Sequence, residues 1–376
     1  MIRTLAVMVA PRADGWLWTA VAGLLTFGLL MVYSASLPEG PRPTVTPAAA
    51  RQCIYALAGV ALMLAVARLD YRRLQRPAAT IYLGTLLLLV AVLATGVSQH
   101  GARRWLDLGP LTLQPAEFAK IALCLAFAAY AAARSPRVAA LLATLGILAL
   151  PAGLVALEPD LGTAIVLGGI WLVLVVAWGV PWRMLAGLLA VGAALGPAAF
   201  AIVPPYQRER LAVFLDPARD PLGSGFNLRQ VEVALGTGGL TGHGLFSGAQ
   251  SHLDSIAARS SDFMFGFVGA ELGLLGALAL IVLLACVVMR GLSAARGASD
   301  AFGRLLASGL TAMVLTQGLI NVAVNLRMFP VTGIPLPFVS QGGSSLIAML
   351  LAVGLLQSIA SHRGPTGSEP RRERRS

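Results

Sequence analysis

Long apolar segments alternate with short polar ones along the whole chain. Many of them approach the ~20 residues that an α-helix needs to cross a bilayer. The pattern predicts ten spanning helices, and the fifth and sixth are nearly continuous with each other. Their approximate ranges are 16–36, 53–68, 78–97, 116–133, 138–157, 161–180, 184–203, 263–289, 304–325 and 344–360.

The composition supports a membrane protein. Of the 376 residues, 57% are hydrophobic and 12% are charged. A soluble fold cannot bury so large an apolar fraction. We therefore expect an all-α polytopic membrane protein, with residues 1–362 forming a single transmembrane domain.

Positive charge orients the predicted spans. The net charge is +11, and most arginines fall in alternate loops, as the positive-inside rule requires. With ten spans, this places both termini in the cytoplasm. The basic tail, residues 363–376, is predicted to be disordered or to lie on anionic lipid. Because the spans explain the arginine pattern, no nucleic-acid partner is expected. The arginines on the cytoplasmic side are Arg3, Arg12, Arg68, Arg72, Arg73, Arg76, Arg134, Arg137, Arg183, Arg290, Arg296 and Arg304.

One outer segment, about residues 204–262, is much longer than the other loops. A polar loop of this length in a small bundle is usually functional or disordered. Two pieces, YQRERLAVFLD and NLRQVEVALG, have apolar residues at helical spacing beside charges. We expect them to form helices that lie at the membrane interface.

Asp262 stands where this loop enters the eighth predicted span. It is either the cap of that helix or a general base at the boundary of a membrane cavity. Glu271 lies more than two turns deeper in the same span, so we expect it to meet a partner inside the bundle.

Two further polar groups interrupt apolar segments. Lys120, the only lysine, follows Glu117 by three residues, so the two side chains share a helix face. They form either a structural ion pair or part of a polar cavity. Asp160, next to Glu158, either caps the sixth span or contributes to a binding site.

The segment RMFPVTGIPLPFVSQGGSS, between the last two spans, is too rich in proline and glycine for regular helix. Irregular backbone at membrane depth survives only beside protein or water. We expect it to line a cavity, with Ser340 to Ser345 offering donors. Four arginines on the outer side depart from the charge bias, and arginines bind phosphate oxygens well. They are Arg103, Arg104, Arg208 and Arg210.

Taken together, six ordered segments resemble the SEDS family of cell-wall polymerases, and its RodA branch more than its FtsW branch. This chain departs from the usual family pattern at Ser260-Ser261, at Ala270 and at Gln341. The matching segments are GARRWLDLGPLTLQPAEFAK (101–120), EPDLGTA (158–164), RERLAVFLDPARDPLGSGFN (208–227), ALGTGGLTGHGLFSGAQSHL (234–253), SDFMFGFVGAELGLLG (261–276) and FPVTGIPLPFVSQGGSSLI (329–347).

The resemblance implies a peptidoglycan glycosyltransferase that polymerises lipid II at the outer face of the bacterial cytoplasmic membrane. It implies Asp262 as the essential catalytic aspartate. The candidate substrate-binding or cavity-lining residues are Arg104, Gln114, Glu117, Lys120, Asp160, Arg208, Arg210, Gln250, Ser340, Gly342, Gly343 and Ser344.

The expected partners are lipid II, a class B penicillin-binding protein that supplies transpeptidase activity, and other membrane proteins of the elongation complex. No histidine or cysteine spacing indicates a metal cluster, although a divalent cation, Mg²⁺ or Mn²⁺, could offset charge on a pyrophosphate leaving group. Two other classes remain open: a lipid II flippase or transporter, and a non-catalytic scaffold of the elongation complex.

Overall fold

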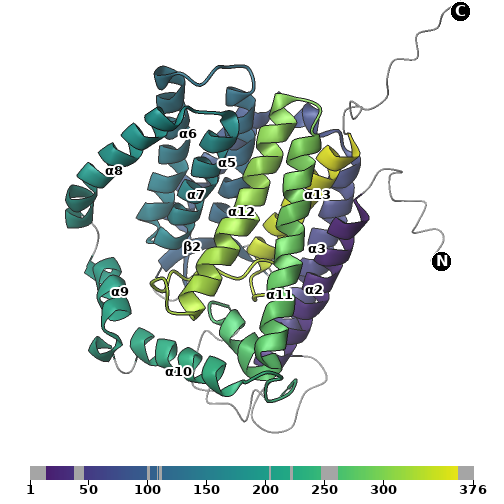
Figure 1. The fold of residues 1–376 in the computed structure, drawn as a ribbon, viewed down its shortest axis with the longest axis vertical. Coiled ribbons are helices and arrows are strands. Elements are labelled where there is room, and N and C mark those ends of the chain that lie inside the picture. Colours follow the sequence, from purple (N-terminus) through teal and green to yellow (C-terminus); the bar gives the residue numbers. More distant parts are fainter. Residues whose placement is uncertain are drawn as a thin grey trace, which may run out of the picture.

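The computed structural model describes residues 14–37, 46–99, 102–107, 109, 112–202, 205–220, 223–246 and 261–362. In this part the protein is a helical bundle with one small sheet (Figure 1). Its elements are α2 (Gly15–Ala35), α3 (Pro47–Arg68), η1 (Tyr71–Leu74), α4 (Ala78–Thr95), β1 (Val97–Gln99), β2 (Ala102–Asp107), β3 (Thr112–Leu113), α5 (Pro115–Ala131), α6 (Val138–Leu157), α7 (Leu161–Trp178), α8 (Trp182–Ile202), α9 (Pro205–Leu215), η2 (Pro217–Arg219), α10 (Ser224–Thr237), α11 (Met264–Gly297), α12 (Ala301–Asn325) and α13 (Gly343–Ser361).

Each of the ten predicted spans coincides with a helix. Within the described ranges, eight helices are long and apolar enough to cross a membrane: α2, α3, α4, α6, α7, α11, α12 and α13. The other two predicted spans are α5, which has 17 residues, and α8, whose apolar part is Trp182–Ala194. The expected multi-pass membrane architecture is therefore confirmed.

Helices α12 and α13 form the centre of the bundle. In their apolar windows 72% and 83% of the residues are buried, compared with 22% in α6 and 28% in α4. The central helices are enclosed by protein, whereas α4 and α6 leave most of their apolar surface available to lipid.

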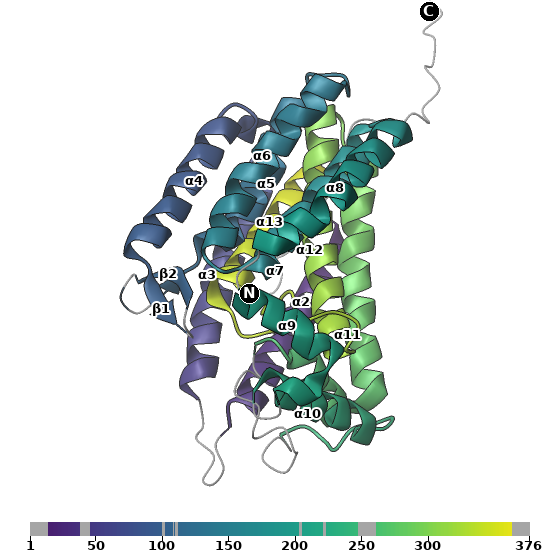
Figure 2. The ribbon, with the colours of Figure 1, turned by 90° about the vertical axis from the view of Figure 1, so that its left-hand side faces the viewer.

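The two ends of the bundle differ. At one end the Gln357 side chain of α13 donates a hydrogen bond to the backbone oxygen of Asp14 (3.1 Å), so the start of α2 and the end of α13 adjoin. At the other end lie α9 and α10 (Figure 2). Both were expected as helices of the long loop, and both helices are confirmed, while their position at the membrane interface stays a prediction.

A three-stranded antiparallel sheet precedes α5 and was not expected. Strand β1 pairs with β2 (Val97 opposite Trp105), and β2 pairs with β3 (Leu106 opposite Leu113). The predicted helical membrane fold is confirmed, and this small sheet is an addition to it. Strands of two and three residues are too short for an alternating pattern to appear in the sequence.

Helix α11 is broken at Gly273, which has φ +63°. The preceding loop, residues 239–244, bonds to the broken turn on both sides. Leu274 N–H donates to the Gly239 oxygen (2.9 Å), and Gly244 N–H donates to the Glu271 oxygen (2.9 Å). The loop thus replaces helical hydrogen bonds that the break removes.

Gly242→Ala should destabilise this region more than Gly239→Ala. Both glycines have positive φ, which costs a residue with a side chain about 1–2 kcal/mol. A methyl group at Gly242 would also lie 2.2 Å from the Glu271 oxygen, whereas Gly239 has open space around it. Thermal unfolding in detergent should give a clearly lower Tm for Gly242→Ala. Equal Tm values for the two variants would show that the loop shifts and makes room for the methyl group at residue 242.

Candidate functional site

Asp262 lies in the turn that leads into α11, and it is not the cap of that helix. The N-cap residue is Phe263, whose own side chain makes no capping hydrogen bond. The Asp262 side chain is half-buried, and its Oδ2 lies 3.7 Å from where a Cβ would stand at Gly333. The capping interpretation is therefore wrong, and the carboxyl faces the irregular segment between α12 and α13.

The charges around Asp262 come from three other parts of the chain. Burial raises the pKa of the Asp262 carboxyl. A hydrogen bond from Ser261 and the positive charges of Arg210 and Arg104 lower this pKa, and the negative charge of Asp160 raises it further. The fold thus gathers Asp262, Asp160, Arg104 and Arg210 into one electrostatic group, which we call the acid–arginine cluster.

Asp160 caps α7, as one of the two interpretations expected, and its role in binding a substrate stays a prediction. Its side chain caps α7 by accepting hydrogen bonds from Thr163 N–H (3.1 Å) and the Thr163 hydroxyl (3.0 Å). The same carboxylate lies 3.8 Å from the Arg104 guanidinium and 3.5 Å from the Gln114 amide nitrogen. The cap is therefore also the point where α7 joins the acid–arginine cluster.

Arg104 fastens β2 to the turn between α6 and α7. Its Nε donates to the Glu158 backbone oxygen (3.0 Å), and its Nη2 donates to the Pro159 oxygen. The side chain is 14% exposed. A guanidinium held by these carbonyls has a fixed position, so it can present charge to the site with little loss of side-chain entropy.

Arg210 and Arg208 differ in their surroundings. Arg210, on α9, is half-buried and donates to the Val331 oxygen (3.3 Å), which joins α9 to the segment that carries Gly333. Arg208 is exposed on the same helix. Arg210 is the residue whose charge acts on Asp262.

Glu158 is a buried acid without a hydrogen-bond partner. Its side chain is 1% exposed, and both carboxylate oxygens lack a donor within the described residues. Burial, with the nearby charge of Asp160, raises the pKa of Glu158 to about 8 despite the opposing charge of Arg104. Glu158 therefore keeps its proton to a higher pH than an ordinary carboxyl group does.

Glu117 and Lys120 form the expected ion pair at the start of α5. Lys120 Nζ lies 2.7 Å from Glu117 Oε2 and 2.7 Å from Gln317 Oε1 on α12. The pair is almost fully buried. Gln317 in turn donates to the Pro335 oxygen (3.0 Å) and to the Ser345 hydroxyl (3.2 Å). The pair is thus connected to the irregular segment and to α13.

The serines and glycines after residue 339 make contacts within the protein. The Ser340 hydroxyl donates to the Ser261 oxygen (2.6 Å), and Ser344 accepts from the backbone N–H of Gln114 (2.9 Å). Gly342 N–H donates to the Gln52 side chain (3.3 Å), and Gly343 packs against the Tyr55 ring, where no Cβ would fit. Their expected contact with a substrate stays a prediction. Gln250 lies outside the described residues.

Glu271 meets a partner inside the bundle, as expected. Ser34 of α2 donates a hydrogen bond to its carboxylate (2.5 Å). This contact joins α11 to α2 two residues before the break at Gly273.

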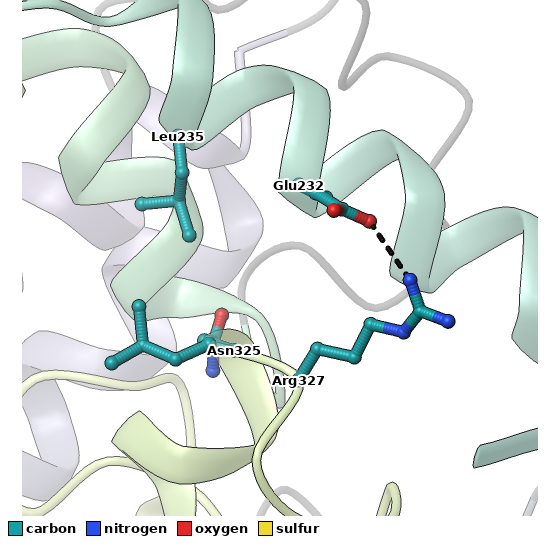
Figure 3. A pocket seen from close by; sticks show the side chains of 5 residues that line it. Glu232, Leu235, Asn325 and Arg327 are labelled. Carbon is teal, nitrogen blue, oxygen red and sulfur yellow. Dashed lines mark hydrogen bonds and ion pairs between the residues drawn. The ribbon is translucent and has the colours of Figure 1, made fainter. Parts of the chain in front are cut away.

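A small pocket of about 210 Å³ opens between α10 and the end of α12. Figure 3 shows Leu235 and Asn325 at one side and the ion pair of Glu232 with Arg327 (3.3 Å) at the other. Pockets that enclose small ligands usually exceed about 300 Å³. This pocket is too small to hold a disaccharide substrate.

Within the described ranges, no three His, Cys, Asp or Glu side chains come together in a way that could hold a metal ion. Mg²⁺ is often held by one or two carboxylates together with substrate phosphates, so a divalent cation at this site stays a prediction.

The sequence analysis missed the polar residues of α12. Gln317, Asn321 and Asn325 are buried and recur at a spacing of four residues, so they share one face of the helix. Three carboxamides at this spacing in an apolar span predict a polar face inside the bundle, because buried polar groups need hydrogen-bond partners.

A family model described as a cell cycle protein, covering FtsW, RodA and SpoVE, matches residues 15–364. Among curated relatives, peptidoglycan glycosyltransferase MrdB of Escherichia coli is 38% identical over 81% of this chain and 83% of its own. A probable peptidoglycan glycosyltransferase FtsW of Idiomarina loihiensis is 36% identical over 95% and 89%. Stage V sporulation protein E of Bacillus subtilis is 34% identical over 90% and 94%.

Solved structures give the same result. A chain from a study of how a peptidoglycan synthase complex coordinates polymerization and crosslinking superimposes with a TM-score of 0.79 at 33% identity, over 93% of this chain and 98% of that one. The rod shape determining protein RodA of Thermus thermophilus superimposes with a TM-score of 0.70 at 30% identity, over 94% and 98%.

Removing one member of the Glu117–Lys120 pair should lower the free energy of unfolding by more than the intact pair contributes to it. Glu117→Ala or Lys120→Ala alone leaves a buried charge unpaired, which costs about 3–5 kcal/mol. The double substitution removes both charges, so its cost should fall below the sum of the single costs by more than about 1 kcal/mol. A double-mutant cycle of unfolding free energies measures this difference. Additive losses would contradict an energetic pairing.

Stability should depend on the protonation of Glu158. Its pKa in the folded protein lies above its ordinary value, so the proton stabilises the fold. This stabilisation is complete below the ordinary carboxyl pKa and is lost as the pH rises towards and past about 8. Glu158→Gln removes the titration, so its Tm should fall less than that of wild type between about pH 5 and about pH 9. Glu209→Gln, at an exposed acid on α9, is the matched control. Parallel Tm curves for wild type and Glu158→Gln would contradict the assignment.

Proposed function

This chain belongs to the FtsW/RodA/SpoVE family and is a peptidoglycan glycosyltransferase, and we propose that it joins lipid II units into glycan strands with Asp262 as general base. The observation that carries this proposal is the position of Asp262. It does not cap a helix, and it shares an electrostatic group with Arg104 and Arg210 beside irregular backbone.

The proposed reaction is a single displacement. The 4-hydroxyl oxygen of the acceptor GlcNAc attacks the anomeric carbon of the donor MurNAc, and the hydroxyl proton passes to the Asp262 carboxylate. The bond between the anomeric carbon and the pyrophosphate oxygen breaks, and undecaprenyl pyrophosphate leaves. One displacement inverts the donor linkage from α to β.

The raised pKa of Asp262 suits this role. A carboxylate in a partly buried site is a stronger base than one in water, while Arg210 and Arg104 still favour its ionised form. Activity should therefore require Asp262 to be deprotonated and should fall on the acid side of its pKa.

The leaving group needs positive charge rather than a dedicated acid, because a pyrophosphate is already a good leaving group. Among the described residues, Arg210 and Arg104 are the cations whose charges act on the proposed base, and Arg208 on the same helix as Arg210 adds a third. A divalent cation, Mg²⁺ or Mn²⁺, remains a prediction, which titration of the polymerisation rate with each ion would test.

We place the active site at the outer face of the bacterial cytoplasmic membrane. The support is the positive-inside pattern together with the charge of Arg210, on α9, that acts on Asp262. Helices α9 and α10 lie at one end of the bundle (Figure 2). The similarity to a chain of a peptidoglycan synthase complex supports an assembly with a crosslinking partner, which we propose to be a class B penicillin-binding protein within the elongation machinery. The organisation into one domain at 1–362 and a basic tail remains a prediction.

Two other functions differ from this proposal in their consequences. A lipid II flippase would move the substrate without forming a bond, and it would tolerate a neutral hydrogen-bonding group at residue 262. A scaffold of the elongation complex would need neither Asp262 nor the arginines in any chemical assay. The names of the similar proteins favour the enzyme.

Asp262→Asn should abolish glycan-strand formation by the purified protein in nanodiscs supplied with lipid II. Asparagine has nearly the same shape as aspartate but cannot accept the proton, so a loss of 100-fold or more, on the order of general-base contributions, is expected. The assay should include the penicillin-binding protein partner, and Tm should confirm that the variant folds. Polymer at the wild-type rate from Asp262→Asn would contradict the assignment of the base. If wild type with its partner makes no polymer but moves lipid II across the bilayer, the flippase would replace the polymerase.

A further inference from the structure

Two buried asparagines of α12 converge on the backbone of Asp262. Asn321 Nδ2 lies 3.0 Å from the Asp262 oxygen, and Asn325 Nδ2 lies 3.1 Å from the same oxygen. Their side chains are 1% and 3% exposed. One carbonyl oxygen therefore receives two amide donors, which use both of its lone pairs.

Each asparagine also holds a second part of the site. Asn321 donates to the Ile334 oxygen (2.8 Å), which is next to Gly333, the residue facing the Asp262 carboxyl. Asn325 accepts from the Gly266 N–H (2.9 Å) in the first turn of α11, a turn that has no other side-chain cap. The two asparagines therefore hold the turn that carries Asp262 against the irregular segment and against the first turn of α11.

The rest of α12 extends this support. Gln317, one turn before Asn321, donates to the Pro335 oxygen and binds Lys120. The consecutive carbonyls of Ile334 and Pro335 are thus held by consecutive turns of one helix. Since α12 lies in the buried centre of the bundle, this face is a rigid support for the irregular segment.

We propose that Asn321 and Asn325 are positioning residues for the glycosyl transfer, acting through the backbone of Asp262 rather than on the substrate. This inference rests on the proposed role of Asp262. The backbone oxygen and the carboxyl group belong to the same residue, so release of the carbonyl lets the carboxyl move relative to Gly333 and Arg210. A displacement of about 1 Å at a reacting group can cost on the order of 100-fold in rate.

The variants Asn321→Leu and Asn325→Leu remove the donors while nearly preserving volume. Each should lower kcat by roughly 10-fold with KM for lipid II within about twofold, and the double variant should lose roughly 100-fold. The pH profile should change as well, because a displaced carboxyl has different burial and different distances to the arginines. In the asparagine variants, the fall of activity on the acid side of the profile (the acid limb) should therefore occur at a different pH than in wild type. Asn321→Gln, which keeps an amide donor, should recover part of the lost rate.

Thr311→Val is the matched control. Thr311 is buried on the same helix, and within the described part of the chain its hydroxyl bonds to the Ala307 oxygen one turn earlier (2.7 Å) and not to the Asp262 turn. This variant should keep the wild-type kcat and pH profile. If a leucine variant folds poorly, Asn321→Ser and Asn325→Ser take its place, because serine is too short to reach the Asp262 carbonyl. Folded asparagine variants with wild-type kcat and an unchanged acid limb would overturn the proposal.

Asp262→Asn, measured in parallel, separates this inference from the proposed function. An inactive Asp262→Asn beside fully active asparagine variants would refute the positioning role alone. A fully active Asp262→Asn would refute the role of Asp262, and with it the reason for positioning that residue.

Discussion

The arrangement of the site depends on Lys120, whose ammonium group needs ion-pair and hydrogen-bond partners inside an apolar bundle. A buried ammonium group costs several kcal/mol unless charges and hydrogen bonds surround it. Lys120 meets this need with Glu117 from its own helix and Gln317 from α12. The amide nitrogen of Gln317 also needs hydrogen-bond acceptors, and it donates to the irregular segment and to α13. A single buried charge thus fixes four parts of the chain relative to one another.

The irregular segment between α12 and α13 owes its conformation to these polar contacts. A non-helical backbone at this depth leaves carbonyl and amide groups that the lipid cannot satisfy. Side chains of α12 bind the carbonyls of Ile334 and Pro335, and the Ser340 hydroxyl binds that of Ser261. With its backbone satisfied in this way, the segment can remain beside Asp262 without becoming helical.

The sequence was most informative where one physical requirement dominated. Membrane helices must be long and apolar, so all ten predicted spans coincide with helices, and the i,i+3 spacing of Glu117 and Lys120 was enough to predict their ion pair. Features that depend on distant partners were not readable. The break at Gly273 requires the 239–244 loop, and strands β1 and β3 before α5 have only three and two residues, too few to show a pattern. The family resemblance identified Asp262, but only the fold brought Arg104, Asp160 and Arg210 to it.

The break in α11 divides that helix into two parts with different contacts. Residues 264–272 are hydrogen-bonded to α12 through Asn325, to α2 through Ser34 and to the 239–244 loop, whereas residues 274–297 continue as a long regular helix. The backbone at Gly273 interrupts the helical hydrogen bonding, so the direction of the short part is set by these contacts and not by the axis of the long part. The turn that carries Asp262 therefore takes its orientation from α2, α12 and the loop.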